Sequence, residues 1–300
     1  MEPPSFAHDG LTRREFLIGA GLTAGALLTG GLLLDRAGPL RGWTAGVRNE
    51  LADAGLFHAL SGVTAENHSL ESRYVDGLVD YAIAWPPGSA PGDPLPVCFA
   101  LPGRGGGPPM GFADTVAEVV DAGASPPYAV VGVDGGVSYW HKREDGEDRL
   151  SMLLDELIPL CAREYGLGAG GDKRALIGWS MGGYGALLAA ETRPRLFAAV
   201  CAVAPAVWTS YEEMMSGPRD AFDSAADFAE HDVIARAERL RHTRVRIDCG
   251  THDPFYGYVT HLTAALPGDF SGGFGDGGHD PSYWRTIAPS QARFLGRALG

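Results

Sequence analysis

The chain has 300 residues, 45% of them hydrophobic, and a formal net charge of −13. This length suits one large domain after a short targeting segment, and the apolar share is enough for a full core. Nucleic-acid-binding proteins need a basic surface stripe, so the acidic balance argues against a nucleic-acid partner and is typical of ordinary solubility.

The N-terminal residues have the pattern of a bacterial twin-arginine export signal. Arg13 and Arg14 are followed by x-Phe-Leu, and residues 16–34 carry no charge. We therefore expect residues 1–40 to engage the twin-arginine export machinery and residues 41–300 to form a catalytic domain outside the cytoplasm. No clear A-x-A cleavage site follows, and the apolar stretch is just long enough to span a bilayer. An N-terminal membrane anchor therefore stays open as an alternative.

The rest of the chain alternates short apolar strands with helical patterns. Residues 40–68 are expected to be a helical or irregular lead-in, and residues 211–242 a polar, mainly helical insertion. Strands are expected over residues 74–85, 97–101, 128–133, 175–177, 198–203 and 245–247. Helices are expected over residues 112–121, 150–165 (with a bend at Pro159), 181–191, 258–265 and 283–299. This alternation predicts an α/β fold with a mainly parallel sheet, helices on both faces and a site at the carboxyl ends of the strands.

The most informative motif is G-x-S-x-G at residues 178–182. An apolar strand at 175–177 precedes it, and a glycine-rich helix start at 183–187 follows. This context predicts a nucleophile elbow, in which Ser180 sits on a strained strand-to-helix turn and the flanking glycines leave room for the crowded backbone. The turn points the hydroxyl at free N–H groups of the helix N-terminus. Ser180 is therefore the expected nucleophile of an α/β-hydrolase fold.

Acyl transfer also needs two hydrogen-bond donors aimed at the oxyanion that forms. The backbone N–H of Met181, the residue after the nucleophile, is the first candidate. The second is the backbone N–H of Arg104, in the glycine-rich loop 103–107. A phosphate-binding loop is the rival interpretation, but it needs an acidic residue about 20 positions further on, and Asp121 fits that spacing poorly.

The order of catalytic residues along this fold is serine, acid, histidine. His279 is the expected base, because it lies in a glycine-rich loop directly before the last helix. Asp253 is the expected acid. It follows the strand at 245–247, from where a carboxylate can reach the imidazole and fix its tautomer. Asp248, still within that strand, is the second choice.

Four further histidines follow Ser180. His231 and His242 fall in the polar insertion and are expected at the surface. His261 lies in a predicted helix, and His252 is a potential neighbour of the acid.

The four cysteines form no C-x-x-C pair and have no histidine at metal-ligand spacing, so no zinc site is expected. The apolar surroundings of Cys98 and Cys201 predict buried thiols. A disulfide stays compatible with a location outside the cytoplasm.

Four stretches together resemble one esterase family: residues 101–103, 178–185, 249–253 and 277–285. That family includes S-formylglutathione hydrolase (esterase D), feruloyl esterases and the mycobacterial mycolyltransferases, and the resemblance covers about residues 70–298. It implies a cofactor-free enzyme with a triad of Ser180, Asp253 and His279 and with oxyanion-hole amides at Arg104 and Met181. The mycolyltransferases carry a glutamate as the triad acid, so the aspartate here favours a hydrolase.

Three functions remain open from the sequence. The first is a serine esterase acting on a small-molecule or lipid ester through an acyl-enzyme. The second is an acyltransferase that passes the acyl chain to a sugar or lipid hydroxyl, and the third is a non-catalytic envelope protein. Six aromatic side chains are expected either to line an acyl or sugar pocket or to pack in the core: Tyr139, Trp140, Phe255, Tyr256, Tyr283 and Trp284.

Overall fold

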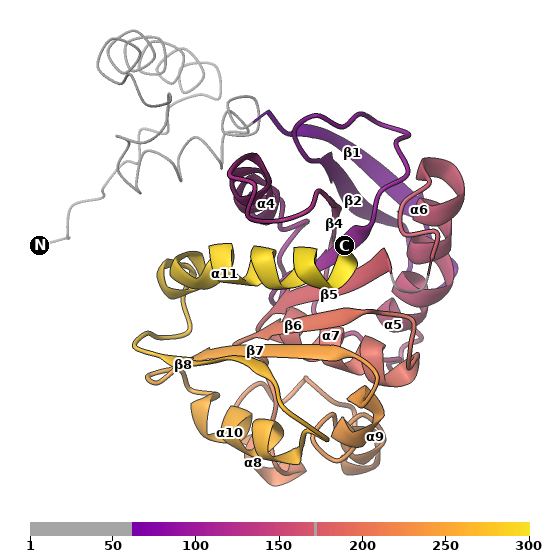
Figure 1. The fold of residues 1–300 in the computed structure, drawn as a ribbon. Coiled ribbons are helices and arrows are strands. Elements are labelled where there is room, and N and C mark those ends of the chain that lie inside the picture. The colour runs from indigo at the N-terminus through magenta and orange to yellow at the C-terminus, as the bar shows by residue number, and fades with distance from the viewer. Residues whose placement is uncertain (1–61, 171–172) are drawn as a thin grey trace, which may run out of the picture. The chain divides into compact units, whose positions relative to one another are not determined.

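The computed structural model describes residues 62–170 and 173–300. Within them an eight-stranded sheet has the order β1-β2-β4-β3-β5-β6-β7-β8 (Figure 1). β1 and β2 pair antiparallel, β2 pairs antiparallel with β4, and all other neighbours are parallel. The strands are β1 (Thr64–Glu71), β2 (Leu78–Trp85), β3 (Val97–Leu101), β4 (Ala129–Val133), β5 (Arg174–Trp179), β6 (Ala199–Val203), β7 (Arg244–Gly250) and β8 (Ser271–Gly275).

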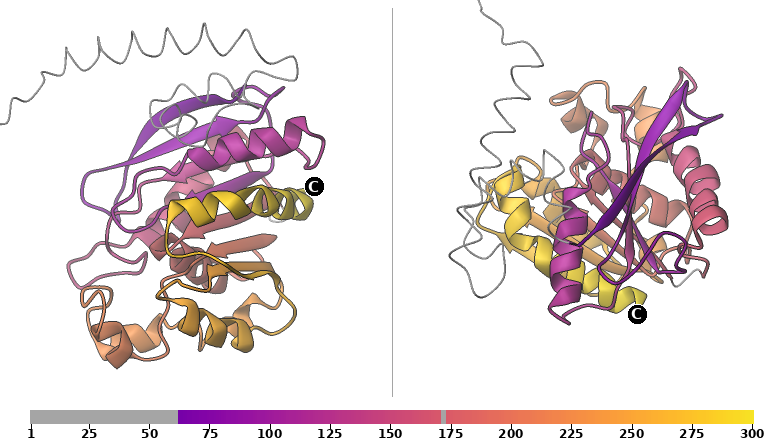
Figure 2. Two further views of the ribbon diagram at one scale, coloured as in Figure 1. Left: turned by 90° about the vertical axis from the view of Figure 1, so that its left-hand side faces the viewer. Right: turned by 90° about the horizontal axis from the view of Figure 1, so that it is seen from above.

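Helices cover both faces of this sheet, as predicted. α4 (Gly111–Asp121) and α11 (Pro281–Leu299) pack against one another on one face. α6 (Ile158–Tyr165), α7 (Met181–Thr192) and α10 (Tyr256–Ala265) lie on the other (Figure 2). The strand side chains alternate accordingly: Cys98 and Ala100 of β3 belong to the core under α4 and α11, whereas Phe99 belongs to the opposite core. Small side chains beneath α4 and α11 let these helices approach the sheet closely.

The structure corrects the sequence prediction at two strands. β1 falls mostly in the segment expected to be helical or irregular, because its sequence is polar and alternates weakly along an exposed edge. β8 was not expected at all. Its glycine-rich sequence has low strand propensity and forms a strand only beside β7.

The predicted helix at 150–165 is continuous but irregular. It comprises α5 (Arg149–Ser151), a π-helical segment (Met152–Leu157) and α6. Pro159 stands at the start of α6 and has no N–H to donate to the preceding turn, which accounts for a departure from α-helical pairing there.

The insertion between β6 and β7 is helical in short pieces. It contains α8 (Tyr211–Met215), α9 (Ala225–Glu230) and a 3₁₀ turn (Ala237–Leu240). Ser210 and Ser224 cap the two α-helices through their side-chain oxygens.

All four cysteines are buried and free, so no disulfide forms among them. The expected export signal at 1–40, the anchor at 16–34 and the domain boundary between residues 40 and 41 lie outside the described residues. Among the helices of residues 62–170 and 173–300, none is both long and apolar enough to cross a bilayer.

Candidate active site

Ser180 lies on a sharp turn between β5 and α7. Its backbone has φ 54° and ψ −117°, a strained conformation for a residue with a side chain. Two glycines make the turn sterically feasible. A Cβ on Gly178 would lie 2.1 Å from the carbonyl oxygen of Gly182, and one on Gly182 would lie 2.0 Å from that of Leu101. The turn is held on the other side by the Ser180 N–H, which donates to the carbonyl of Val203 at 2.9 Å.

The side chains of Ser180, His279 and Asp253 form a chain of hydrogen bonds. His279 Nδ1 lies 2.8 Å from Asp253 Oδ2, and His279 Nε2 lies 2.9 Å from Ser180 Oγ. A carboxylate can only accept, so Nδ1 carries the proton and Nε2 is free to accept from the serine hydroxyl. The Asp253 side chain is fully buried, and the His279 side chain is 24% exposed. Such an arrangement can remove a proton from the serine and hold the resulting imidazolium.

The acid is positioned by the turn that ends β7. Asp253 Oδ1 accepts the N–H of Phe255 at 2.8 Å, which leaves the other carboxylate oxygen for the imidazole. The acid loop also touches the histidine loop, since the N–H of His252 donates to the carbonyl of Gly277 at 2.9 Å.

The base is positioned by the start of α11. Asp280 caps that helix by accepting the N–H groups of Ser282 and Tyr283, and Pro281 occupies its first turn. Hydrogen bonds from Ser282 and Tyr283 lower the pKa of Asp280. His279 directly precedes this cap, so the helix start fixes where its imidazole emerges.

Asp248, the second choice for the acid, is engaged elsewhere. Its carboxylate accepts from the Arg246 guanidinium at 2.7 and 2.8 Å and from the amide of Gln291 at 2.9 Å. Asp248 therefore belongs to a buried ion pair beneath α11. Of the two candidate acids, Asp253 is the one that contacts His279.

The two expected oxyanion donors lie next to the serine. Met181 is the first residue of α7, and Gly103 is close enough that a Cβ there would lie 3.7 Å from Ser180 Cβ. Within the described part of the chain, the backbone N–H groups of Arg104 and Met181 have no hydrogen-bond acceptor. The Arg104 side chain points away to an ion pair with Asp220 at the surface.

A cavity of about 260 Å³ opens beside Ser180, between α4 and α11. Its wall is mainly apolar, and Arg285 contributes the charged group. Of the six aromatic residues singled out in the sequence, Trp284 lines it, while Tyr139, Trp140 and Tyr283 are buried in the core. The cavity is lined by Pro102, Gly103, Pro109, Gly111, Phe112, Thr115, Trp179, Pro281, Trp284, Arg285 and Ala288.

Phe112 and Trp179 were missed as pocket residues. Their rings meet edge to face at a centroid distance of 5.7 Å. Trp179 occupies the first variable position of G-x-S-x-G, directly before the nucleophile, and this position could have indicated a pocket residue. Nothing in the local sequence marks Phe112, which reaches the cavity only because α4 packs beside the elbow.

The side chains of the other four histidines after Ser180 take no part in the contacts among Ser180, His279 and Asp253. His242 and His261 are exposed, and His252 forms an exposed ion pair with Asp276 at 3.3 Å. His231, expected at the surface, is instead half-buried against Asp227.

Comparisons with known proteins identify a family and a fold for this chain. The sequence model of a family described as "Putative esterase" matches residues 72–286. A solved ferulic acid esterase superimposes with a TM-score of 0.66 and 22% identity, over 79% of this chain and 99% of that chain. An S-formylglutathione hydrolase from Agrobacterium tumefaciens gives 0.64 and 17%, over 80% and 96%. A substrate-bound, fluorophosphonate-binding serine hydrolase from Staphylococcus aureus gives 0.63 and 16%, over 79% and 99%. A search of curated proteins finds no match.

Proposed function

The chain belongs to the esterase family and is a carboxylic ester hydrolase with the α/β-hydrolase fold, and from this premise we propose that it hydrolyses its substrate through a triad of Ser180, His279 and Asp253. The observation that carries the proposal is the unbroken contact from Asp253 through His279 to Ser180. No other described histidine contacts the serine of the elbow.

The reaction has two steps. His279 Nε2 takes the hydroxyl proton while Ser180 Oγ attacks the ester carbonyl, and the proton then passes to the leaving alcohol. Water, deprotonated by the same nitrogen, attacks the acyl-enzyme, and the proton returns to Ser180 as the acid is released. Asp253 holds the Nδ1–H tautomer and stabilises the imidazolium in both steps.

The backbone N–H groups of Arg104 and Met181 are proposed to form the oxyanion hole. Their lack of acceptors among the described residues supports this role, because a free donor beside the nucleophile can bind the developing negative charge. Losing one such donor typically costs about 3 kcal/mol of transition-state stabilisation.

The cavity beside Ser180 supports a compact acyl group. Its volume of about 260 Å³ falls just below the roughly 300–1,000 Å³ of drug-sized ligand sites. A short or aromatic acyl group fits such a space better than a long lipid chain, which favours hydrolysis over transfer of a mycolyl-sized chain.

A serine-specific test uses the full-length chain and an exposed control. Ser180→Ala is expected to abolish both hydrolysis of p-nitrophenyl esters and labelling by a fluorophosphonate probe, with an unchanged circular dichroism spectrum. Ser216→Ala, at an exposed serine, is expected to behave as the wild type. Labelling that persists in Ser180→Ala would remove this serine as the nucleophile.

A second experiment distinguishes a hydrolase from an acyltransferase. When an acyl donor is supplied together with trehalose, a transferase would form more transfer product than free acid.

We also propose export by the twin-arginine route, on the Arg13-Arg14 pair and the uncharged residues 16–34. Replacing both arginines with lysine should leave the chain in the cytoplasm of a bacterial host. Unchanged export of that variant would contradict the proposal.

A further inference from the structure

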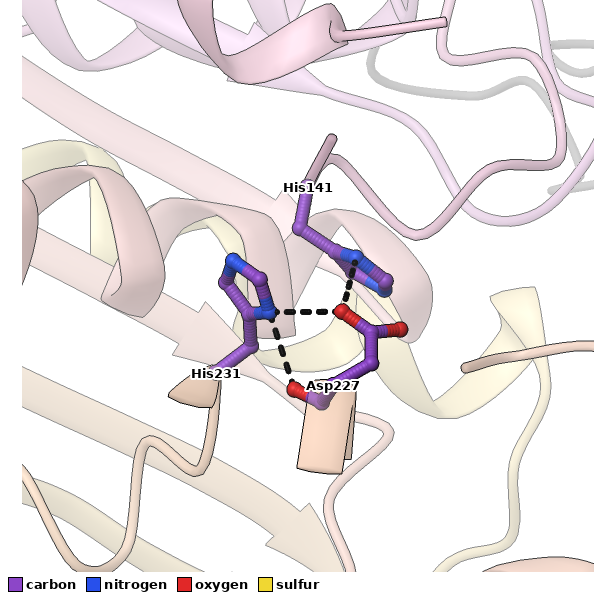
Figure 3. Close-up of side chains that lie close together, drawn as sticks. All are labelled: His141, Asp227 and His231. Atoms are coloured by element: carbon purple, nitrogen blue, oxygen red, sulfur yellow. Dashed lines mark hydrogen bonds and ion pairs between the residues drawn. The ribbon is translucent and has the colours of Figure 1, made fainter. Parts of the chain in front are cut away.

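Three polar side chains outside the proposed triad lie close together (Figure 3). His141 follows β4 in the chain, Asp227 lies in the first turn of α9, and His231 is the C-cap of that helix. His141 Nδ1 and His231 Nδ1 lie 3.4 and 2.9 Å from the same oxygen, Asp227 Oδ1. His231 Nδ1 also lies 2.9 Å from the backbone carbonyl oxygen of Asp227, so this nitrogen carries a proton, which a bound ion would replace. The three ligand atoms all lie within 4.8 Å of one another. The hydrolytic mechanism proposed above uses none of these three residues.

The hydrogen bonds of His141 fix which ring nitrogen carries its proton. Nε2 lies 3.0 Å from the carbonyl oxygen of Ala221, which can only accept, so Nε2 is the donor. In the neutral ring the lone pair is then on Nδ1, which faces two oxygens, the Asp227 carboxylate and the carbonyl of Lys142 at 3.3 Å. A cation placed between this lone pair and the two oxygens would interact favourably with all three.

The position of His141 suits a metal ion as that cation. The His141 side chain is fully buried, so a bound ion would be held away from solvent. The neutral imidazole is the form that ligates metals. Metal-binding histidines typically donate their second ring N–H to a carbonyl, as His141 does to Ala221.

Asp227 and His231 are spaced as a metal-binding pair on one helical turn. They are four residues apart, which brings a residue in the first turn of α9 next to its C-cap, and both side chains are about 15% exposed or less. Asp227 Oδ2 accepts the N–H of Asp223 at 2.8 Å, which orients the carboxylate and leaves Oδ1 toward the two rings.

We propose that His141 Nδ1, His231 Nδ1 and Asp227 Oδ1 bind a divalent transition-metal ion, with Zn²⁺ as the best match. Two imidazoles and one carboxylate are a zinc ligand set, and water or a nearby carbonyl completes four-coordination. Bonds of about 2.0–2.1 Å at tetrahedral angles put ligand atoms about 3.3 Å apart. The His141–Asp227 separation of 3.4 Å matches, and the His231–Asp227 separation of 2.9 Å must widen by a few tenths of an ångström.

The bound ion would join the segment after β4 to the insertion, and both of these contact the nucleophile helix. Tyr184, in the first turn of α7, donates its hydroxyl to the carbonyl of His231 at 3.1 Å. Trp140, next to His141, is held at φ 65° against Gly185 of the same helix. The ion would therefore join the strained residues Tyr139 and Trp140, through the adjacent His141, to α9 beside the first turns of α7, as a structural brace.

Zn²⁺ binding to the full-length, chelator-treated protein tests the proposal. We expect one equivalent of Zn²⁺ by competition with a chromophoric chelator, and an increase in Tm when Zn²⁺ is added, because an ion bound only by the folded state stabilises it. Wild-type protein that binds no Zn²⁺ and shows no change in Tm would overturn the site and leave a hydrogen-bonded His–Asp–His cluster. This measurement uses the wild-type protein only, so it does not depend on whether a variant folds.

Two substitutions locate the ion. Asp227→Asn keeps the shape and an acceptor for Asp223, and His231→Ala changes a partly exposed side chain. Each is expected to lower Zn²⁺ affinity by at least about 10-fold. His242→Ala, an exposed histidine on the same insertion, is the matched control and should bind as the wild type. Equal affinity in all four proteins would place the ion elsewhere and overturn the assignment.

Discussion

Gly250 and Gly277 lie in backbone contact: a Cβ built on Gly250 would come within 2.2 Å of the carbonyl oxygen of Gly277. These glycines belong to the two loops that carry Asp253 and His279. The carboxylate and the imidazole therefore meet at 2.8 Å only because neither loop has a side chain at the point where they touch.

Gly250→Ala is expected to lower kcat by about 100-fold or more, because the methyl group would push the two loops apart by a distance on the ångström scale. Steady-state kinetics with a p-nitrophenyl ester measure this loss. Gly257→Ala is the matched control. That glycine lies in α10 with open space around its Cβ position, so activity should be kept. A Gly250→Ala enzyme with wild-type kcat would mean that the loops adjust without separating the pair.

Asp253→Asn should lower kcat by up to about 10⁴-fold, because the amide can donate to Nδ1 and stabilise the wrong imidazole tautomer. Asp248→Asn should instead lower the free energy of unfolding, by about 3 kcal/mol, since it leaves Arg246 buried without its partner. Urea denaturation and kinetics on both variants separate the two roles. The reverse pattern would assign the acid to Asp248.

Thr115→Phe is expected to narrow the cavity between α4 and α11. We expect kcat/KM for aromatic or longer acyl esters to fall by about 10-fold or more, with hydrolysis of the acetate ester nearly unchanged. A p-nitrophenyl ester series from two to sixteen carbons measures the change. An equal loss for every ester would show that the cavity does not hold the acyl group.

Glu191→Gln should raise stability increasingly with pH. Glu191 is fully buried on α7, and desolvation raises its pKa from 4.5 to about 9 despite the nearby Arg236 guanidinium. Between those pH values the unfolded chain has lost this proton and the folded chain keeps it. This residue therefore lowers stability as pH rises, by up to about 1.4 kcal/mol per pH unit.

Denaturant unfolding of the wild type and Glu191→Gln at pH 5, 7 and 9 tests this dependence. Glutamine does not titrate, so the difference between the two proteins should widen with pH in favour of the variant. A difference that stays constant from pH 5 to 9 would show that Glu191 ionises normally in the folded protein.

The central strands and the three contacting side chains could be predicted because their signals are local. Ser180 has its glycines and strand in one continuous segment, and His279 and Asp253 stand in short loops next to an obvious helix and strand. The glycines beside these residues are required by close backbone approaches. A glycine is visible in the sequence even though the segment that approaches it is not.

Features made by distant segments could not be predicted in this way. Phe112 reaches the cavity only through the packing of α4, and β8 exists only because β7 offers it an edge. Only the folded structure distinguishes His141 and His231 from the other histidines, because it brings both beside Asp227. The local sequence around each of these features is equally compatible with an ordinary exposed surface.

Helix α11 carries both the base and part of the pocket wall. His279 precedes its cap, and Trp284, whose ring lies 5.2 Å from the imidazole, lines the cavity together with Ala288. An acyl group that displaces this helix must also displace the imidazole from Ser180. Discrimination between substrates should therefore show in turnover number as much as in affinity, so that a poorly fitting ester occupies the enzyme yet reacts slowly.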